Sequence, residues 1–163
     1  MALKNKIKIE SFVVDKLREK DFNEVLKLAI LAQSNFGLSD ASAPSLFLRE
    51  IKNLIEENME FSFVFRTLNG KVFAVFVIKP ETNICAELAL ALSDSDILQT
   101  KEMYQEFNNI LNSFKFKIVL AKVYKKRKKI QTYIKFLNTL GFKEILNENE
   151  RVITLSKISN VYL

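Results

Sequence analysis

The ten residues Ile134–Lys143 read IKFLNTLGFK and carry the clearest fold signal in this sequence. Their apolar side chains recur every three or four positions, which is the spacing of one face of a helix. Gly141 follows the last of these positions, where a glycine typically ends a helix in a left-handed conformation. The stretch therefore predicts a helix over 127–140, closed by a glycine and followed by a strand over 142–146.

The same periodicity, followed outward in both directions, predicts the remaining elements. Strands are expected over 7–14, 61–68, 71–79, 84–92, 118–124 and 151–158, and helices over 22–36, 45–58 and 97–114. The predicted order is β-α-α-β-β-β-α-β-α-β-β. No repeat, low-complexity segment or interior linker interrupts this order, so we expect one α/β domain over 1–163.

Local sequence signals predict a turn, a helix cap, a loop and a buried strand within this pattern. Asn69-Gly70 between two apolar runs predicts a hairpin with a type I′ turn, in which both central residues have positive φ. Asp21 is the expected N-cap of the first helix, and residues 39–44 form the clearest loop. The run over 84–92 is almost entirely apolar, so we expect this strand to be buried on both faces.

The composition excludes several kinds of chemistry. The chain has no His and a single Cys, so it can hold neither a Ser-His or Cys-His nucleophile nor an imidazole or multi-thiolate metal site. Cys85 lies in an apolar run and is expected to be a small buried side chain. We expect no metal and no membrane partner, and a cytoplasmic location. The high Lys, Asn, Ile and Phe content is typical of an AT-rich genome, for which a viral source, with the protein in host cytoplasm or virion, is one interpretation.

The element order resembles the fold of the GCN5-related N-acetyltransferases (GNAT), the acyl-CoA N-acyltransferase fold, over essentially the whole chain. Residues 17–21 resemble the usual opening of the first helix in this family. Residues Ile134–Lys143 resemble the end of the family's fourth helix. The resemblance implies a central mixed, mostly antiparallel twisted sheet flanked by about four helices. It also implies acetyl-CoA binding between the splayed fourth and fifth strands.

In this family the pyrophosphate of CoA lies on the backbone N–H groups of a glycine-rich turn that opens the third helix. The corresponding residues 92–100 read LSDSDILQT, without glycine or arginine and with carboxylates at Asp94 and Asp96. Two negative charges would oppose the phosphates, so we interpret Asp96 as a helix cap with Gln99 reaching back in a capping box. By resemblance, the residues placed for a cofactor are Leu92, Ser93, Gln99, Thr100, Lys126, Arg127 and Gln131.

The resemblance also places the candidate catalytic residues. Leu137 occupies the position of a frequent general-acid tyrosine, so Tyr124 or Tyr133 would have to replace it, unless both only pack. Glu87 lies in the apolar fourth strand and is the candidate general base. Its alternative role is an ion pair with a lysine of the hairpin or of the fifth strand.

Positive charge is concentrated in one part of the chain. Residues 107–143 contain ten basic and no acidic side chains, and five of them form the run Lys125–Lys129, which we name the basic run. Such a run beside a helix start indicates a bound anion, namely CoA phosphate, nucleic acid or an acidic protein surface, or else a solvated charged face.

Two hypotheses follow. The first is a binding or assembly module of GNAT fold with a degenerate acetyl-CoA site and no cofactor, in contact with a protein partner, another copy of itself or a polyanion through the basic run. The alternative is an acetyl-CoA-dependent N-acetyltransferase with an unorthodox CoA site.

Overall fold

The computed structural model describes residues 5–36 and 44–158. The strands are β1 (Phe12–Lys16), β2 (Phe63–Thr67), β3 (Val72–Pro80), β4 (Cys85–Ser93), β5 (Ile118–Tyr124), β6 (Glu144–Glu148) and β7 (Val152–Ile158). The helices are α1 (Phe22–Phe36), α2 (Pro44–Glu57), α3 (Lys101–Ser113) and α4 (Ile130–Thr139), with two short 3₁₀ helices, η1 (Glu19–Asp21) and η2 (Met59–Phe61). The predicted element order is confirmed, while the predicted loop over 39–44 lies outside the described residues up to position 43.

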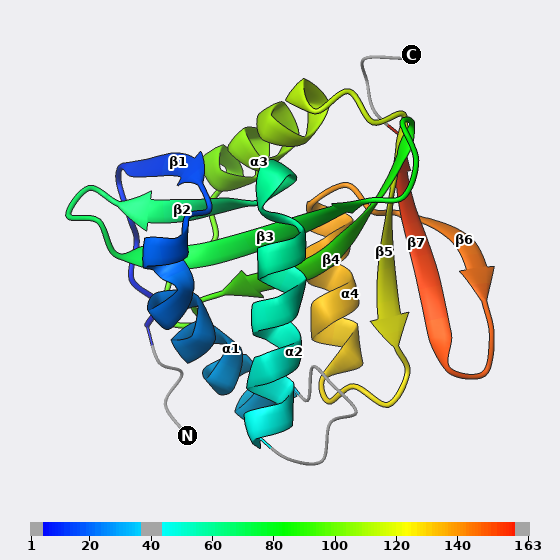
Figure 1. Cartoon of the computed structure of the whole chain (residues 1–163), viewed down its shortest axis with the longest axis horizontal. Coiled ribbons are helices and arrows are strands. Elements are labelled where there is room, and N and C mark those ends of the chain that lie inside the picture. The colour runs from blue at the N-terminus through cyan, green and yellow to red at the C-terminus, as the bar shows by residue number, and fades with distance from the viewer. Residues whose placement is uncertain (1–4, 37–43, 159–163) are drawn as a thin grey trace.

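The strands form one sheet in the order β1-β2-β3-β4-β5-β7-β6. All neighbours are antiparallel except β4 and β5, which run parallel. Helices α1 and α2 lie on one face of the sheet and α3 and α4 on the other (Figure 1). The expected mixed, mostly antiparallel sheet with four flanking α-helices is therefore confirmed over the described residues. None of the helices within them combines the length and apolar character of a membrane span.

Alternation along β2 divides the core into two parts. Phe63 and Phe65 pack on the α3–α4 side with Phe76 and Phe107, whose ring centroids lie 4.8 Å apart. Val64 lies between them and packs on the opposite side, with α1 and α2. Because successive strand residues point to opposite faces, the sequence places an aromatic core on one side of the sheet and an aliphatic core on the other. The central strand β4 is buried along most of its length, as predicted.

The hairpin at Asn69-Gly70 joins β2 and β3 as predicted, but the turn is not type I′. Gly70 has a φ of +95°, whereas Asn69 has none of the positive φ that a type I′ turn requires. The Gly70 N–H donates to the Thr67 carbonyl at 2.9 Å, and the Thr67 N–H donates to the Lys71 carbonyl at 2.8 Å. The loop thus has three residues and needs only one in the left-handed region, which is the usual longer alternative to a two-residue turn.

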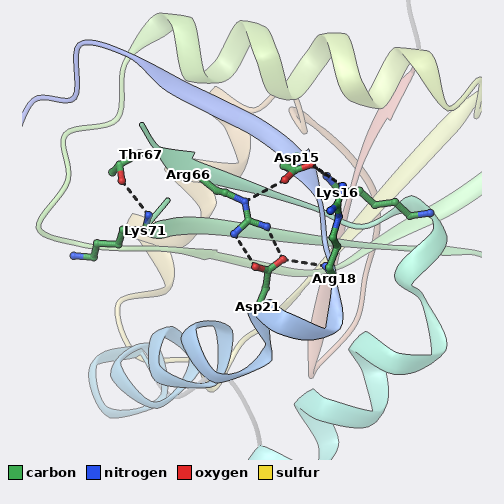
Figure 2. Close-up of polar contacts among 7 residues, drawn as sticks. All are labelled: Asp15, Lys16, Arg18, Asp21, Arg66, Thr67 and Lys71. Carbon is green, nitrogen blue, oxygen red and sulfur yellow. Dashed lines mark hydrogen bonds and ion pairs between the residues drawn. The ribbon is translucent and has the colours of Figure 1, made fainter. Parts of the chain in front are cut away.

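A buried ion cluster fixes the corner between β1, β2 and α1 (Figure 2). The Arg66 guanidinium donates to both carboxylate oxygens of Asp21 at 2.6 Å, and its Nε donates to Asp15 at 3.3 Å. Asp21 is 1% exposed and Arg66 8% exposed. Asp21 directly precedes α1, as predicted for an N-cap, and its carboxylate also accepts a hydrogen bond from the Arg18 N–H at 3.0 Å. The predicted cap residue therefore also links the start of the first helix to the second strand.

The chain enters the sheet later than predicted, because the expected strand over 7–14 begins only at Phe12. Ile7 instead forms an isolated parallel bridge with Ile97 in the loop before α3. The Ile7 N–H donates to the Asp96 carbonyl at 2.7 Å, and the Leu98 N–H donates to the Ile7 carbonyl at 2.8 Å. A segment near the N-terminus thus lies across the loop where the resemblance places the CoA phosphates.

The two parallel strands diverge after a short contact. Residues 85–87 of β4 pair with residues 118–120 of β5, and the described residues show no further pairs between these strands. On its other side, β4 pairs with β3 through a register shift between Val77 and Ile78. The C-terminal ends of β4 and β5 therefore separate, as the resemblance implies, and the candidate site lies beside this end of β4.

Candidate functional site

A cavity of about 300 Å³ lies at the C-terminal end of β4. Its walls come from this end of β4, the loop to α3, the start of α3 and one side of α4, with single residues from the N-terminal segment, α1 and the turn before α4. The described residues that line it are Lys6, Ala32, Ala91, Leu92, Ser93, Asp94, Ser95, Ile97, Gln99, Tyr104, Arg127, Thr132, Tyr133, Lys135, Phe136 and Thr139. The cavity thus combines apolar walls with hydroxyl, amide and cationic groups.

A chain of side-chain hydrogen bonds runs along the β4–α3 wall. The Tyr104 hydroxyl donates to Gln99 Oε1 at 2.6 Å, and Gln99 Nε2 donates to Ser93 Oγ at 3.4 Å. Burial raises the pKa of the Tyr104 hydroxyl, so it remains a donor at neutral pH. This chain fixes the Gln99 amide between the strand end and the third helix.

Arg127 and Tyr133 also line the cavity and contact each other. The Arg127 guanidinium carbon lies 3.3 Å from the centroid of the Tyr133 ring, which is a cation–π contact. Arg127 Nε is buried and has no hydrogen-bond partner among the described residues. Burial lowers the pKa of the Arg127 guanidinium, and burial raises the pKa of the Tyr133 hydroxyl against the opposing effect of Arg127. Tyr133 is therefore a neutral, protonated phenol, and Arg127 brings a partly desolvated positive charge to the cavity.

The third helix begins later than predicted, and a different residue caps it. Thr100 is the N-cap of α3, with its hydroxyl accepting a hydrogen bond from the Met103 N–H at 3.4 Å. The predicted capping box of Asp96 and Gln99 is wrong, because Gln99 bonds to Ser93 and Tyr104. The helix starts at Lys101, so the loop from β4 to α3 is longer than the sequence pattern indicates.

The N–H groups of this loop are occupied by the protein itself. The Asp94 N–H donates to the Phe73 carbonyl at 2.8 Å, and the Ile97 N–H donates to the Asp94 carbonyl at 3.1 Å. The Asp96 N–H donates to the Asp94 carboxylate at 2.9 Å. With the Leu98 N–H bonded to Ile7, four backbone donors in residues 94–98 have acceptors within the chain.

The residues of this loop differ in two respects from those that hold a phosphate at a helix start. A phosphate held at a helix start needs backbone N–H groups directed at it and no competing negative charge. Here four donors are occupied, and Asp94 holds a carboxylate in the lining of the cavity, 3.8 Å from Lys71 Nζ. Residues 94–98 thus combine an absence of glycine and the presence of two carboxylates with four backbone N–H groups that bond within the chain.

The structure brings together four of the seven residues that the resemblance places near a cofactor. The residues in the cavity lining are Leu92, Ser93, Gln99 and Arg127, joined by the candidate acid Tyr133. Thr100 caps α3. Lys126 and Gln131 are exposed and are not among the lining residues. Their assignment to a cofactor stays a prediction.

Glu87 and Tyr124 lie apart from the cavity lining. The Glu87 carboxylate is 4.0 Å from Lys122 Nζ on β5, with 17% of its side chain exposed. This is the ion pair that was the alternative to a general base. Tyr124 ends β5 and is half-exposed. Of the three candidate catalytic residues, Tyr133 is thus the one in the lining, and the catalytic assignments stay predictions.

The basic run does not act as five equivalent cations. Lys125 Nζ lies 3.1 Å from Glu148 on β6, and Arg127 turns toward the cavity. Lys129 has a φ of +54° and stands at the N-cap of α4 without a side-chain capping bond. Lys126 and Lys128 are exposed. Lys129 is exposed as well, so the exposed positive surface of the run consists of these three lysines.

Sequence reasoning missed several lining residues. Thr132, Lys135, Phe136 and Thr139 follow helical spacing on α4, on a side other than the one that buries Leu137. That spacing could have identified them once the face of Leu137 had been assigned to the core. Lys6 and Tyr104 carry no comparable local signal, because long-range contacts bring them to the cavity.

Solved structures show what this chain is similar to, whereas no family model and no curated protein sequence matches it. The PaiA N-acetyltransferase of Thermoplasma acidophilum, in complex with coenzyme A, superimposes with a TM-score of 0.65 over 91% of this chain and 99% of its own, at 14% identity. Ard1 of Thermoplasma volcanium gives 0.65 over 90% and 97%, at 17% identity.

The ribosomal-protein-S18-alanine N-acetyltransferase of Escherichia coli gives a TM-score of 0.64 over 91% of this chain and 94% of its own, at 14% identity. At these identities the likeness establishes the fold. The divergence of β4 and β5 and the placement of the four helices agree with it. The chain has the fold of the GCN5-related N-acetyltransferases.

Proposed function

We propose that this chain is a binding or assembly module of GNAT fold that does not transfer acetyl groups, and that it contacts an anionic partner through the basic run. The observation that carries this proposal is the loop over 94–98. Four of its five N–H groups are bonded within the chain, and it carries carboxylates in place of the glycines that the family uses.

The free-energy cost of placing a phosphate at this loop favours the proposal over cofactor binding. Freeing two of the occupied N–H groups would cost about 1–3 kcal/mol, at about 0.5–1.5 kcal/mol for each hydrogen bond. Bringing a phosphate near Asp94 would cost roughly another 1–4 kcal/mol at a few Å separation. Binding of a cofactor at 100 µM corresponds to about 5.5 kcal/mol. The two costs together are comparable to the whole free energy of such binding.

The partner would meet the protein at the turn between β5 and α4. Lys126 and Lys128 are exposed there, and Lys125 and Glu148 join this turn to the edge strand β6. An acidic protein surface, including one on another copy of the chain, would pair with these lysines. A nucleic-acid backbone would offer the same charge, and its binding would fall steeply with added salt.

Tyr133 favours the second candidate function, an acetyl-CoA-dependent N-acetyltransferase. It lies in the cavity lining, and burial raises the pKa of its hydroxyl, as a proton donor requires. In this candidate function Glu87 would be the base and Tyr124 or Tyr133 the acid. It also requires the loop over 94–98 to exchange its own hydrogen bonds for a ligand.

Calorimetric titration with acetyl-CoA separates the two functions. We expect no detectable heat at millimolar ligand, at low or moderate salt. Binding tighter than about 100 µM would contradict the proposal and would lead to a screen of amine substrates. The Asp94→Asn, Asp96→Gly double variant is the matched comparison, because it removes both carboxylates and restores a glycine in the loop. A gain of acetyl-CoA affinity in this variant would support the claim that these residues block the site.

A further inference from the structure

We propose that the cavity at the end of β4 binds a small molecule that carries a carboxylate on an apolar body, with the carboxylate held by Arg127. This inference goes beyond the proposed function, which concerns the exposed lysines of the basic run. It concerns the one member of that run that lies in the cavity lining.

Arg127 is placed as an anion receptor. The ring of Tyr133 covers one face of its guanidinium at 3.3 Å, so its hydrogen bonds must run in the plane of the group. Nε lies on that plane, is buried, and has no partner among the described residues. A buried donor without a partner is rare in folded proteins. Because the protein covers Nε, a ligand acceptor would satisfy it only when the Arg127 side chain shifts toward the cavity that it lines.

The charges around the cavity favour an anion. Lys6 and Lys135 join Arg127 in the lining, whereas Asp94 is the acidic residue among the described lining residues and lies near Lys71. Three cations thus surround a space that holds one carboxylate with its own ion pair. An anionic ligand would reduce the repulsion among these cations.

The shape and the remaining lining define the rest of the ligand. Ala91, Leu92, Ile97 and Phe136 supply apolar surface. The volume of about 300 Å³ is at the lower end of the roughly 300–1,000 Å³ typical of small-molecule sites. A planar guanidinium edge matches a carboxylate in bidentate geometry. We therefore infer a carboxylate on a short apolar chain as the preferred class.

The test uses sodium octanoate as the probe, with octan-1-ol and inorganic phosphate as comparison ligands. The readout is the ¹⁵N–¹H signal of the Arg127 Nε–Hε group, identified by its loss in Arg127→Lys. We expect octanoate to shift this signal in a saturable way, while octan-1-ol and phosphate leave it in place. Arg127→Gln should weaken octanoate binding, measured by calorimetry, about ten-fold or more, because it removes a charged hydrogen-bond donor.

Arg49→Gln is the matched control. Arg49 is exposed on α2, on the other face of the sheet, and this variant makes the same change of charge. It should change octanoate affinity less than about two-fold. Thermal melting of each variant separates loss of binding from loss of folding, and Arg127→Lys provides a second, more conservative change.

Three results would overturn the inference. These are an unshifted Nε–Hε signal at saturating octanoate, equal weakening by Arg127→Gln and Arg49→Gln, and a shift with phosphate but not with octanoate. A titration with acetyl-CoA, followed by the same NMR signal, distinguishes failure of this inference from failure of the proposed function. Binding of acetyl-CoA would contradict the proposed function, whereas failure of octanoate alone would contradict only this inference.

Discussion

Replacing Asp21 with alanine tests the buried ion cluster at the corner of β1, β2 and α1. The change removes the two hydrogen bonds of 2.6 Å from Arg66 and the one of 3.0 Å from the Arg18 N–H. It leaves the Arg66 guanidinium buried, with Asp15 at 3.3 Å as its remaining acidic partner in the cluster (Figure 2). Breaking one side of a buried ion pair typically costs about 3–5 kcal/mol. Because domains of this size are stable by about 5–15 kcal/mol, the variant should lose a large part of its free energy of unfolding.

Urea denaturation followed by circular dichroism measures this cost. Glu56→Gln is the control, because Glu56 forms an exposed ion pair with Lys52 at 3.8 Å on α2 and should contribute less than about 0.5 kcal/mol. An Arg66→Met, Asp21→Ala double variant should recover most of the loss, since it removes both charges together. A cost below about 1 kcal/mol for Asp21→Ala would refute the reasoning, as would a double variant less stable than the single one.

Two other predictions concern the same corner and the end of α4. Burial alone raises the pKa of Asp21, but its hydrogen bonds to Arg66 and Arg18 outweigh this, so the pKa of the carboxyl is lower in the folded state. The ionised Asp21 carboxylate therefore contributes its full stability above the pKa of about 3.9 that it has in the unfolded chain, and this contribution is lost as pH falls through its pKa in the folded protein. The urea midpoint should therefore fall more steeply with decreasing pH for the natural chain than for Asp21→Asn. Gly141→Ala should cost about 1–2 kcal/mol and more than Gly70→Ala. Both glycines have positive φ, but a Cβ at Gly141 would clash with Lys157 Nζ, whereas one at Gly70 would meet nothing within 4 Å. Equal thermal shifts for the two glycine variants would show that Lys157 moves away freely.

The features that could be predicted from the sequence are those set by local spacing. The stretch Ile134–Lys143 gave the end of α4, and Gly141 has the left-handed φ of +103° expected of a helix-ending glycine. Periodicity of apolar residues placed the other strands and helices to within a few residues, except for the starts of β1 and α3, which lie later than predicted. These signals depend on neighbours in the chain, so they are visible without knowledge of the fold.

The start of α3 depended on contacts that the sequence does not show. Asp96 and Thr100 are both acceptable cap residues, and their spacing alone cannot choose between them. The choice follows from Ile7, whose backbone bonds to Asp96 and Leu98 and extends the loop before the helix. Ninety residues separate these partners, so only the folded chain reveals the pairing.

The basic run shows the same limit for the candidate site. Its five side chains look equivalent in sequence, yet Lys125 pairs with Glu148 and Arg127 stacks on Tyr133. The left-handed Lys129 ends the turn at the start of α4. The direction of each side chain depends on this turn and on the position of β6. Charge alone could therefore not predict which side chains of the basic run pair with a carboxylate, stack on a ring or remain exposed.

The central claim is that the loop before α3 uses its own N–H groups and leaves them unavailable to a phosphate. Amide hydrogen exchange at Asp94, Ile97 and Leu98, followed by NMR with and without millimolar acetyl-CoA, tests it most directly, because these three amides donate to backbone carbonyls of the chain. We predict slow exchange at all three residues and no change in their rates or chemical shifts when acetyl-CoA is added. Rapid exchange in the free protein, or a saturable shift of these amides on addition of acetyl-CoA, would contradict the account.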